Sequence, residues 1–324
     1  MKGEFVLSND QINTWRQQGA FVMQLPETVC GSAISWLNEN FTIDQIDSSH
    51  VDFGTPDREF EFPTKLKVLD DLVLNEFLIK AVQQLLDAED IRLLQADLWP
   101  KIGTASDGHD AQANTDQRMH MDYGNNTLLH PDWMEPDSVA AIIYYDDSDE
   151  TAGGTAFVTR RGEDDPVYRP PYVNMPGQGG RPFFNDREAV ESWFYENDSQ
   201  AYELRKLLYE RERLVSFKPG TILFYRHDIW HRGTPVVEGK LRRVHNLAWR
   251  RADARGWSNW NEGWARQSYY GPIESIIGRS TPLQRSLLDF PMPGDKYWTE
   301  QRIQNVQARF EFYGFDAAPY RALL

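Results

Sequence analysis

The sequence predicts a mainly β protein with flanking helices, of the sandwich or jelly-roll class. Helical patterns dominate before residue 91, whereas after it short apolar runs alternate with turns rich in Gly, Pro and Asp. Short strands in this arrangement favour antiparallel sheets over alternating strand–helix units. With 40% hydrophobic residues among 324, the chain also has enough apolar material for a sizeable core.

The opening of the chain predicts helices that support the sheet. Ser8 and Gln11 have the spacing of a capping box, and Gly19 is expected to end that helix before a short strand. A second helix is expected near 26–40. Residues 65–90 carry leucines at helical spacing, which indicates one longer helix.

Seven short strands are predicted for the core. They are Ile91–Trp99, Arg118–Tyr123, Ser138–Tyr145, Thr155–Thr159, Glu212–Phe217, Thr221–Tyr225 and Arg242–Trp249. An insertion at 160–211 separates the fourth from the fifth. Its first half is rich in Pro and Gly, and its second half, 186–208, has a helical pattern. An insertion of this length is usually a functional lid or a binding loop.

We therefore expect a single domain over residues 1–324. Residues 1–90 are expected to form a helical N-terminal support, 91–251 the jelly-roll core and 252–324 a C-terminal helical extension. The sequence shows no internal repeat and no low-complexity linker that would divide it.

The charge balance excludes two classes of partner. The chain has 34 basic and 49 acidic residues, a net charge of −15, and so acidic a surface repels nucleic acid and anionic membranes. A small-molecule substrate is the expected partner. The single cysteine, Cys30, excludes an intrachain disulfide and a thiolate cluster. The polar N-terminus and the lack of a run of about 18 apolar residues predict a cytoplasmic protein.

A possible metal site begins with His120 and Asp122. They lie in a strand-like run, and residues two apart in a strand point to the same face, so that both can reach one ion. The sequence contains a second His-x-Asp pair, at 130 and 132. Because Pro131 removes a ladder hydrogen-bond donor there, we favour the first pair.

A third ligand is expected from a later strand. The run 217–225 reads as a turn followed by a buried strand, and two histidines come soon after it, His227 and His231. His227 is next to an aspartate, and His231 precedes a Gly-Thr-Pro turn. The residues alone leave both open. Two histidines and one carboxylate, with three coordination positions left open, form the ligand set of non-haem Fe(II) oxygenases.

From Lys218 to Trp249 the sequence resembles the phytanoyl-CoA dioxygenase family of Fe(II)/2-oxoglutarate-dependent oxygenases. The similarity lies in a glycine turn, an apolar strand, a histidine before small residues and a proline, and an arginine eleven residues later; these positions are His231 and Arg242. The His120-x-Asp122 pair, the PDSVAAIIYYDD and TAGGTAF runs and the LSNDQINTWRQQGAFVM opening are similar too. The resemblance implies a double-stranded β-helix core, a cupin-like jelly roll.

The resemblance also implies a ligand set and a reaction. His120, Asp122 and His231 would bind Fe(II), with 2-oxoglutarate as cosubstrate and O₂ as oxidant. The implied activity is a dioxygenase that hydroxylates an unactivated C–H bond of a small-molecule metabolite and releases succinate and CO₂. The carboxylate at Asp122 argues against a halogenase, because related halogenases carry a small residue there.

Cosubstrate binding is implied at the second carboxylate of 2-oxoglutarate. An arginine fork suits a planar carboxylate, and the family spacing favours Arg242, with Arg243 as the alternative because strand alternation does not decide between them. A serine that the family often places two residues after the distal histidine is Gly233 here. Thr234, the next residue, is therefore the expected hydroxyl contact.

Substrate contacts are expected near the metal motifs in the sequence. The candidates are Trp99, Tyr123, Asn126, Tyr225 and Trp230. Arginines of the insertion (Arg160, Arg161 and Arg169) can meet a carboxylate substrate, although exposed charge explains them equally well. Two other classes stay open: a cupin-like metalloenzyme that does not use 2-oxoglutarate and would not need Arg242, and a non-catalytic jelly-roll binding module, which Fe(II) would not stabilise against heat.

Overall fold

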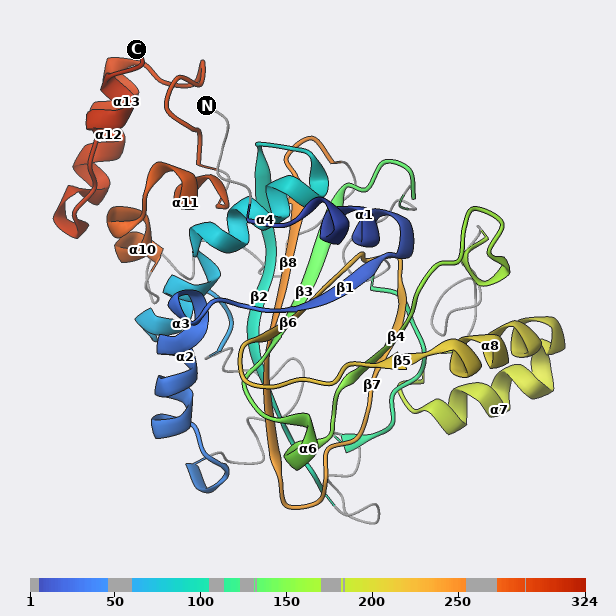
Figure 1. Cartoon of the computed structure of the whole chain (residues 1–324). Helices are drawn as coiled ribbons and strands as arrows, with labels where there is room; N and C mark the ends of the chain where they lie inside the picture. The colour runs from blue at the N-terminus through green and yellow to red at the C-terminus, as the bar shows by residue number, and fades with distance from the viewer. Residues whose placement is uncertain are drawn as a thin grey trace.

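The computed structural model contains two packed antiparallel sheets with helices around them (Figure 1). It describes residues 6–45, 60–104, 114–122, 131, 133–169, 182, 184–254, 273–288 and 290–324. Two of the candidate substrate contacts, Tyr123 and Asn126, lie outside the described residues. So do both members of the second His-x-Asp pair, His130 and Asp132.

The larger sheet has five strands in the order β1-β6-β3-β8-β2, and the smaller has three in the order β5-β4-β7. The strands are β1 Ala20–Gln24, β2 Ile91–Ile102, β3 Ser138–Tyr144, β4 Thr155–Val158, β5 Arg213–Leu214, β6 Thr221–Tyr225, β7 Trp230–Gly233 and β8 Leu241–Arg251. All their pairings are antiparallel. The predicted jelly-roll class with flanking helices is confirmed.

The helices lie around the sheets (Figure 1) and fall into three groups by their order in the chain. The first contains α1 Asn9–Gln18, α2 Glu27–Asn40, η1 Ile43–Gln45, α3 Lys67–Val73 and α4 Glu76–Leu86; the second contains α6 Ser148–Thr151, η4 Pro166–Tyr168, α7 Arg187–Asn197 and α8 Ser199–Arg211; the third contains α10 Ile273–Arg279, α11 Pro282–Ser286, α12 Glu300–Phe310, η5 Glu311–Tyr313 and α13 Ala318–Arg321. Of the described helices, none combines the length and apolar content that a membrane crossing requires.

The two faces of the larger sheet pack against different partners. On β8, Leu247 and Trp249 belong to the apolar cluster shared with α1 to α4, whereas Val244 belongs to the cluster between the two sheets. On β3, Tyr144 and Tyr145 divide in the same way. Since side chains alternate along a strand, this register fixes which residues face the space between the sheets, where the candidate site lies.

Several predicted elements differ from the structure because local caps divide them. The helix expected over 65–90 is two helices, α3 and α4, since the Asn75 side chain accepts a hydrogen bond from Phe77 N and starts a new helix. The helix expected over 186–208 divides likewise, where Asp198 caps α8. The capping box at Ser8 and Gln11 is confirmed.

Two predicted strands are shorter than expected and one strand was missed. Within the described part of the expected strand Arg118–Tyr123, His120 makes a single isolated bridge to His231, and the strand expected over 212–217 is only the two residues of β5. The missed strand is β7, whose four residues, Trp-His-Arg-Gly, have no apolar alternation for a sequence pattern to reveal.

Arg243 connects the larger sheet to α2. Its guanidinium group is buried and donates to the Leu37 carbonyl at 2.7 Å, to Asn38 Oδ1 at 2.8 Å and to the Phe41 carbonyl at 3.1 Å. It also pairs with Asp146, with Nη2 and Oδ1 2.6 Å apart. Every direction of the guanidinium is therefore used to hold the fold.

Replacing Arg243 by methionine should lower the free energy of unfolding by about 3 kcal/mol, because Asp146 and two backbone carbonyls would remain buried without their donor. Urea denaturation measures this loss. Arg242→Met is the matched control, since the side chain of Arg242 makes none of these bonds. An equal loss of stability in both variants would contradict the assignment.

Candidate metal centre

Two segments far apart in sequence meet at His120 and His231. The backbone N–H of each residue donates to the carbonyl of the other, both at 2.9 Å, in an antiparallel bridge between the segment 114–122 and β7. Directly opposed residues project their side chains to the same face. Asp122, two residues beyond His120, joins that face, and its N–H donates to the His227 carbonyl at 3.0 Å.

The three side chains converge on one point. His231 Nε2 lies 3.1 Å from Asp122 Oδ2, and His120 Nε2 lies 3.4 Å from Asp122 Oδ1. One ligand atom from each residue falls within 4.8 Å of the others, which happens for no other group of three or more potential metal ligands in the described part of the chain. A single ion between these atoms would contact all three.

Both imidazoles are oriented for coordination through Nε2. His120 Nδ1 lies 3.0 Å from the Arg118 carbonyl, and His231 Nδ1 lies 3.1 Å from the Ile229 carbonyl. A carbonyl accepts only, so each Nδ1 must carry a proton, and in the neutral form of either ring the lone pair is on Nε2. A second hydrogen bond of this kind is characteristic of metal-bound histidine.

The electrostatics of the cluster also fit a cation. Burial lowers the pKa of His120 to about 4, so its imidazole is neutral at pH 7. Burial alone would raise the pKa of Asp122, but His231 and His120 outweigh it and hold that pKa well below its usual range. Burial would lower the pKa of His231, and the Asp122 carboxylate reverses this and raises it. A metal ion would replace the proton that His231 shares with Asp122.

The geometry groups His231, and not His227, with the pair at 120 and 122. Residue 227 contributes its carbonyl to Asp122 N–H, while its imidazole is outside the cluster. Burial lowers the pKa of His227 to about 4. The two histidines that the sequence left open are therefore separated by the register of β7.

Of the expected substrate contacts that the structure describes, Tyr225 lies closest to the cluster. Its hydroxyl donates to Asp122 Oδ2 at 2.9 Å, and its ring centroid is 4.9 Å from that of His231. Trp99 is half-buried and sits opposite Val244 in the β2–β8 pairing, which places it on the same inner face. Trp230 instead is fully buried, and its indole Nε1 donates to the Val167 carbonyl at 2.7 Å, so the structure gives it a packing role.

Two cations lie side by side on the inner face, Lys101 buried and Arg242 half-buried. Arg242 of β8 is directly paired with Lys101 of β2. Their side chains therefore project from the same face of the sheet. Lys101 Nζ donates to the Thr234 carbonyl at 3.1 Å and to the Thr115 carbonyl at 3.3 Å. Among the described residues, no acceptor reaches the buried Nε of Arg242, and no carboxylate lies within 4.0 Å of either cation.

Both cations have a pKa below the ordinary value of their side chain. Burial, together with the repulsion of Arg242, lowers the pKa of Lys101 to about 7. Burial also lowers the pKa of Arg242, partly offset by Tyr144 and Asp146. Holding two like charges side by side in a largely buried position is costly, and a bound anion would reduce that cost. Sequence reasoning missed Lys101, because only the strand register brings it beside Arg242.

The structure also resolves the other cosubstrate candidates. Arg243, the alternative to Arg242, lies on the opposite face of β8 and is fully used against α2 and Asp146. The Thr234 hydroxyl donates to the Gly154 carbonyl at 2.8 Å, so its proton is not available to a ligand. A Cβ atom at Gly233 would lie 2.7 Å from Gln117 Oε1, which accepts a hydrogen bond from the Gly233 N–H at 3.0 Å, so a serine there would require Gln117 to move.

Asp97 is a second inner-face residue that the sequence did not reveal. It alternates with Trp99 and Lys101 along β2 and lies opposite Asn246 of β8. Burial raises the pKa of Asp97 to about 7, and Gln95 Nε2 donates to its Oδ1 at 2.8 Å. The inner wall of β2 therefore has a carboxyl group toward one end and an ammonium group toward the other.

The helical half of the insertion holds the segment that carries the metal ligands. Arg205 of α8 is completely buried, donates to the Met119 carbonyl at 3.1 Å and pairs with Glu191 of α7 at 2.7 Å. The Tyr209 hydroxyl donates to Glu191 at 2.8 Å and accepts from Met119 N–H at 3.3 Å. Helices α7 and α8 thus hold the backbone of Met119, directly before His120, where a lid or binding loop was expected.

Comparison with known proteins establishes the fold. No protein-family model and no curated protein sequence matches the chain. Among solved structures, the non-heme alpha ketoglutarate dependent carbocyclase SnoK from nogalamycin biosynthesis matches with a TM-score of 0.50 and 13% identity, over 84% of this chain and 95% of that one. EctD from S. alaskensis (TM-score 0.49, 14% identity, 82% and 85% covered) and HygX from Streptomyces hygroscopicus with nickel and 2-oxoglutarate bound (0.48, 14%, 80% and 92%) also match. The likeness to the carbocyclase shows a common fold.

Substituting Arg205 by methionine should weaken binding of a divalent metal by about tenfold, because losing an outer support of a ligand typically costs 10- to 100-fold in affinity. Titration of the metal-free protein with Co²⁺, followed by absorbance, measures this. Lys206→Met is the control, since Lys206 is the exposed neighbour on α8 and pairs only with Glu203. Equal Co²⁺ affinity in the two variants would show that the helices do not support the site.

Proposed function

We propose that the protein is an Fe(II)- and 2-oxoglutarate-dependent oxygenase that hydroxylates a C–H bond of a small molecule. One observation carries the proposal: a His-Asp-His cluster and a pair of neighbouring cations, Lys101 and Arg242, which form no ion pair with the described carboxylates, share the inner face of one jelly roll. Lys101 Nζ contacts the carbonyl of Thr234, three residues beyond His231. At the usual rise of a strand this is roughly 10 Å, a separation that suits a five-carbon diacid bound at both ends.

The donor set fits ferrous iron. Two neutral imidazole nitrogens and one carboxylate oxygen, with no thiolate, are the ligands of non-haem Fe(II) oxygenases. When bound there, iron and 2-oxoglutarate would supply the activation of O₂, with one oxygen atom entering the substrate C–H bond and the other the succinate that forms as CO₂ leaves. In support, SnoK, a solved structure that shares this fold, is described as an alpha ketoglutarate dependent carbocyclase.

Each protein group has a distinct task in this proposal. His120, Asp122 and His231 hold the metal, and the Tyr225 hydroxyl fixes the rotation of the Asp122 carboxylate through its 2.9 Å hydrogen bond. Arg242 binds the far carboxylate of 2-oxoglutarate as a fork.

The neighbouring groups complete the site. Lys101 adds a second positive charge beside that carboxylate. The apolar side chains between the sheets, Val244 and Leu223 among them, exclude water from the site. The resemblance of the sequence to the phytanoyl-CoA dioxygenase family agrees with these roles, and a reducing cytoplasm would preserve ferrous iron.

Anaerobic addition of Fe(II) and 2-oxoglutarate should produce a weak visible metal-to-ligand charge-transfer band. The band should be absent in His231→Ala and in His120→Ala, because each variant removes one of three ligands. His227→Ala is the matched control and should retain the band, since its imidazole lies outside the cluster. A band that survives in His231→Ala, or that disappears only in His227→Ala, would refute the proposed ligand set. Release of succinate in air then reports turnover.

Affinity for 2-oxoglutarate should fall as the pH rises above about 7. Below that pH Lys101 is protonated in the free protein and binds the carboxylate directly; above it, each bound anion must bring a proton, which weakens binding by up to tenfold per pH unit. Calorimetric titration of the Fe(II)-loaded protein without O₂, at pH 6.5 and 8.5, measures the difference.

The control for this pH dependence is Lys101→Met. This variant should bind 2-oxoglutarate more weakly at pH 6.5 and lose most of the difference between the two pH values. A cupin-like enzyme that does not use 2-oxoglutarate predicts no binding at either pH, and no effect of Arg242→Met on activity. An unchanged pH dependence in Lys101→Met would exclude a role for this lysine.

A further inference from the structure

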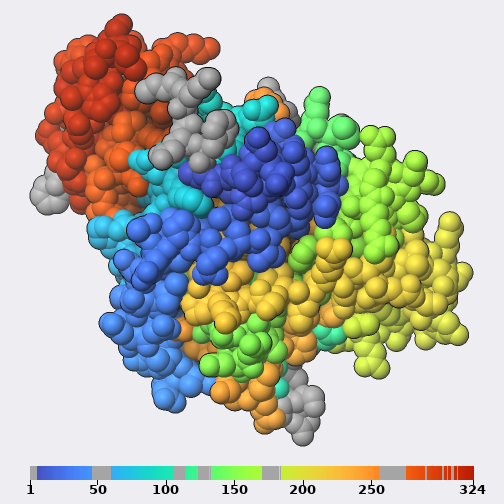
Figure 2. Space-filling view, in the orientation of Figure 1, coloured from blue at the N-terminus to red at the C-terminus, as the bar shows by residue number. Residues whose placement is uncertain are grey.

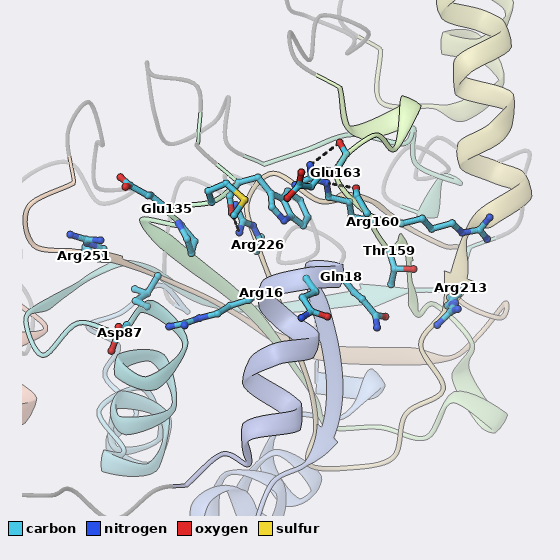
Figure 3. A pocket seen from close by; sticks show the side chains of 17 residues that line it. Arg16, Gln18, Asp87, Glu135, Thr159, Arg160, Glu163, Arg213, Arg226 and Arg251 are labelled. Carbon is cyan, nitrogen blue, oxygen red and sulfur yellow. Dashed lines mark hydrogen bonds between the residues drawn. The ribbon is translucent and has the colours of Figure 1, made fainter.

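A separate cavity of about 930 Å³ opens at the end of the jelly roll where α1, β4, β6 and β8 end (Figure 3). Its lining includes Gln18, Thr159, Arg226 and Arg251, each at or just beyond the end of one of these elements, and none of the three metal-site residues. The volume is in the range of pockets that bind small molecules. The space-filling view shows α1, in dark blue, on the surface of the molecule (Figure 2).

The charge of this cavity is opposite to that of the protein. Its lining contains three carboxylates, from Asp87, Glu135 and Glu163, and twice as many guanidinium groups. The arginines are Arg16, Arg160, Arg161, Arg213, Arg226 and Arg251. In a chain with 49 acidic and 34 basic residues, this gathering creates a local positive field in a concave surface.

One wall of the cavity is fixed and its charge is already compensated. Trp133 is covered by two guanidinium groups, that of Arg226 at 4.1 Å and that of Arg160 at 4.5 Å from the ring centre. Arg226 is buried and forms a two-point ion pair with Asp228, at 2.8 and 2.9 Å. Arg160 donates to the carbonyls of Gly162 and Glu163, as Figure 3 shows. This wall shapes the pocket but does not require a ligand.

Two other arginines have no such partners. The guanidinium groups of Arg161 and Arg213 are exposed and make no hydrogen bond or ion pair with any residue that the structure describes. The backbone of Arg161 is nevertheless held, since its N–H donates to Asp165 at 2.7 Å. Arg16 donates only weakly, to the Leu85 carbonyl at 3.4 Å. All three side chains line the cavity and come from three different segments; in Figure 3 Arg16 extends toward Asp87, on the side of the pocket away from Arg213.

We propose that this pocket binds a small organic anion, a phosphate or a carboxylate, through Arg161 and Arg213. Charge-assisted bonds from planar guanidinium groups suit both kinds of anion, and the stacked Trp133 wall supplies a rigid backing for the rest of the ligand. The site adjoins the metal-ligand segment, because Arg226 directly precedes His227, whose carbonyl holds Asp122. The proposal does not depend on iron or on 2-oxoglutarate.

Calorimetric titration of the metal-free full chain at low ionic strength tests the proposal, with inorganic pyrophosphate and tricarballylate as probes. Saturable binding of one probe is expected, and the probe that binds more tightly identifies the anion as phosphate or carboxylate. Arg213→Ala and Arg161→Ala should each weaken binding about tenfold, as expected for a lost charged hydrogen bond. Arg169→Ala is the matched control: it removes an exposed arginine of the same insertion that lies outside the pocket.

Two further variants separate this site from the proposed active site. Lys101→Met should retain the binding, which shows that the probe is not at the inner cation pair, and His231→Ala should retain it as well. Absence of saturable binding for both probes would overturn the proposal, as would an equal loss in Arg169→Ala and Arg213→Ala, which indicates only general screening. These failures would leave the charge-transfer test of the metal site unaffected.

Discussion

The candidate centre depends on one backbone interaction, the reciprocal pair of hydrogen bonds between His120 and His231. Residues 114–122 form no continuous ladder with either sheet, so this bridge sets the relative position of the two imidazoles. It also fixes the face on which Asp122 lies. The carbonyls of Arg118 and Ile229 then fix the tautomer of each ring. A shift of one residue in this pairing would turn one imidazole away and dismantle the cluster.

On the inner face of the jelly roll, the negatively charged and the positively charged side chains lie at different positions. Near β7 a carboxylate is held between imidazoles, and farther along β2 and β8 two cations lie without a counterion. Buried charges are retained only where a partner or a ligand compensates them. A metal ion at the first position and a dicarboxylate reaching the second would compensate both, so the same electrostatic imbalance supports both halves of the proposed function.

The segments outside the two sheets also contact the metal-ligand segment and β8, and they line the arginine-rich cavity. The buried Arg205 of α8 donates a hydrogen bond to the Met119 carbonyl, next to His120. Arg243 of β8 likewise donates to the Leu37 carbonyl of α2. At the end of the jelly roll, arginines from α1, from the start of the insertion and from β5 surround a cavity of their own. The insertion thus contributes both to the rigidity of the metal-ligand segment and to the surface proposed to bind an anion.

The sequence by itself determined the local features: the jelly-roll class from strand length and turns, the helix start at Ser8, and the pairing of His120 with Asp122, because period-two spacing is a property of a single strand. Tertiary structure decided the rest. It brought His231, and not His227, to the metal cluster, and it placed Arg242 and Arg243 on opposite faces of β8. It also buried Trp230 in a packing role and brought Lys101 beside Arg242. These outcomes depend on the register between strands distant in the chain, and hydrogen bonds across a sheet leave no spacing signal within either strand.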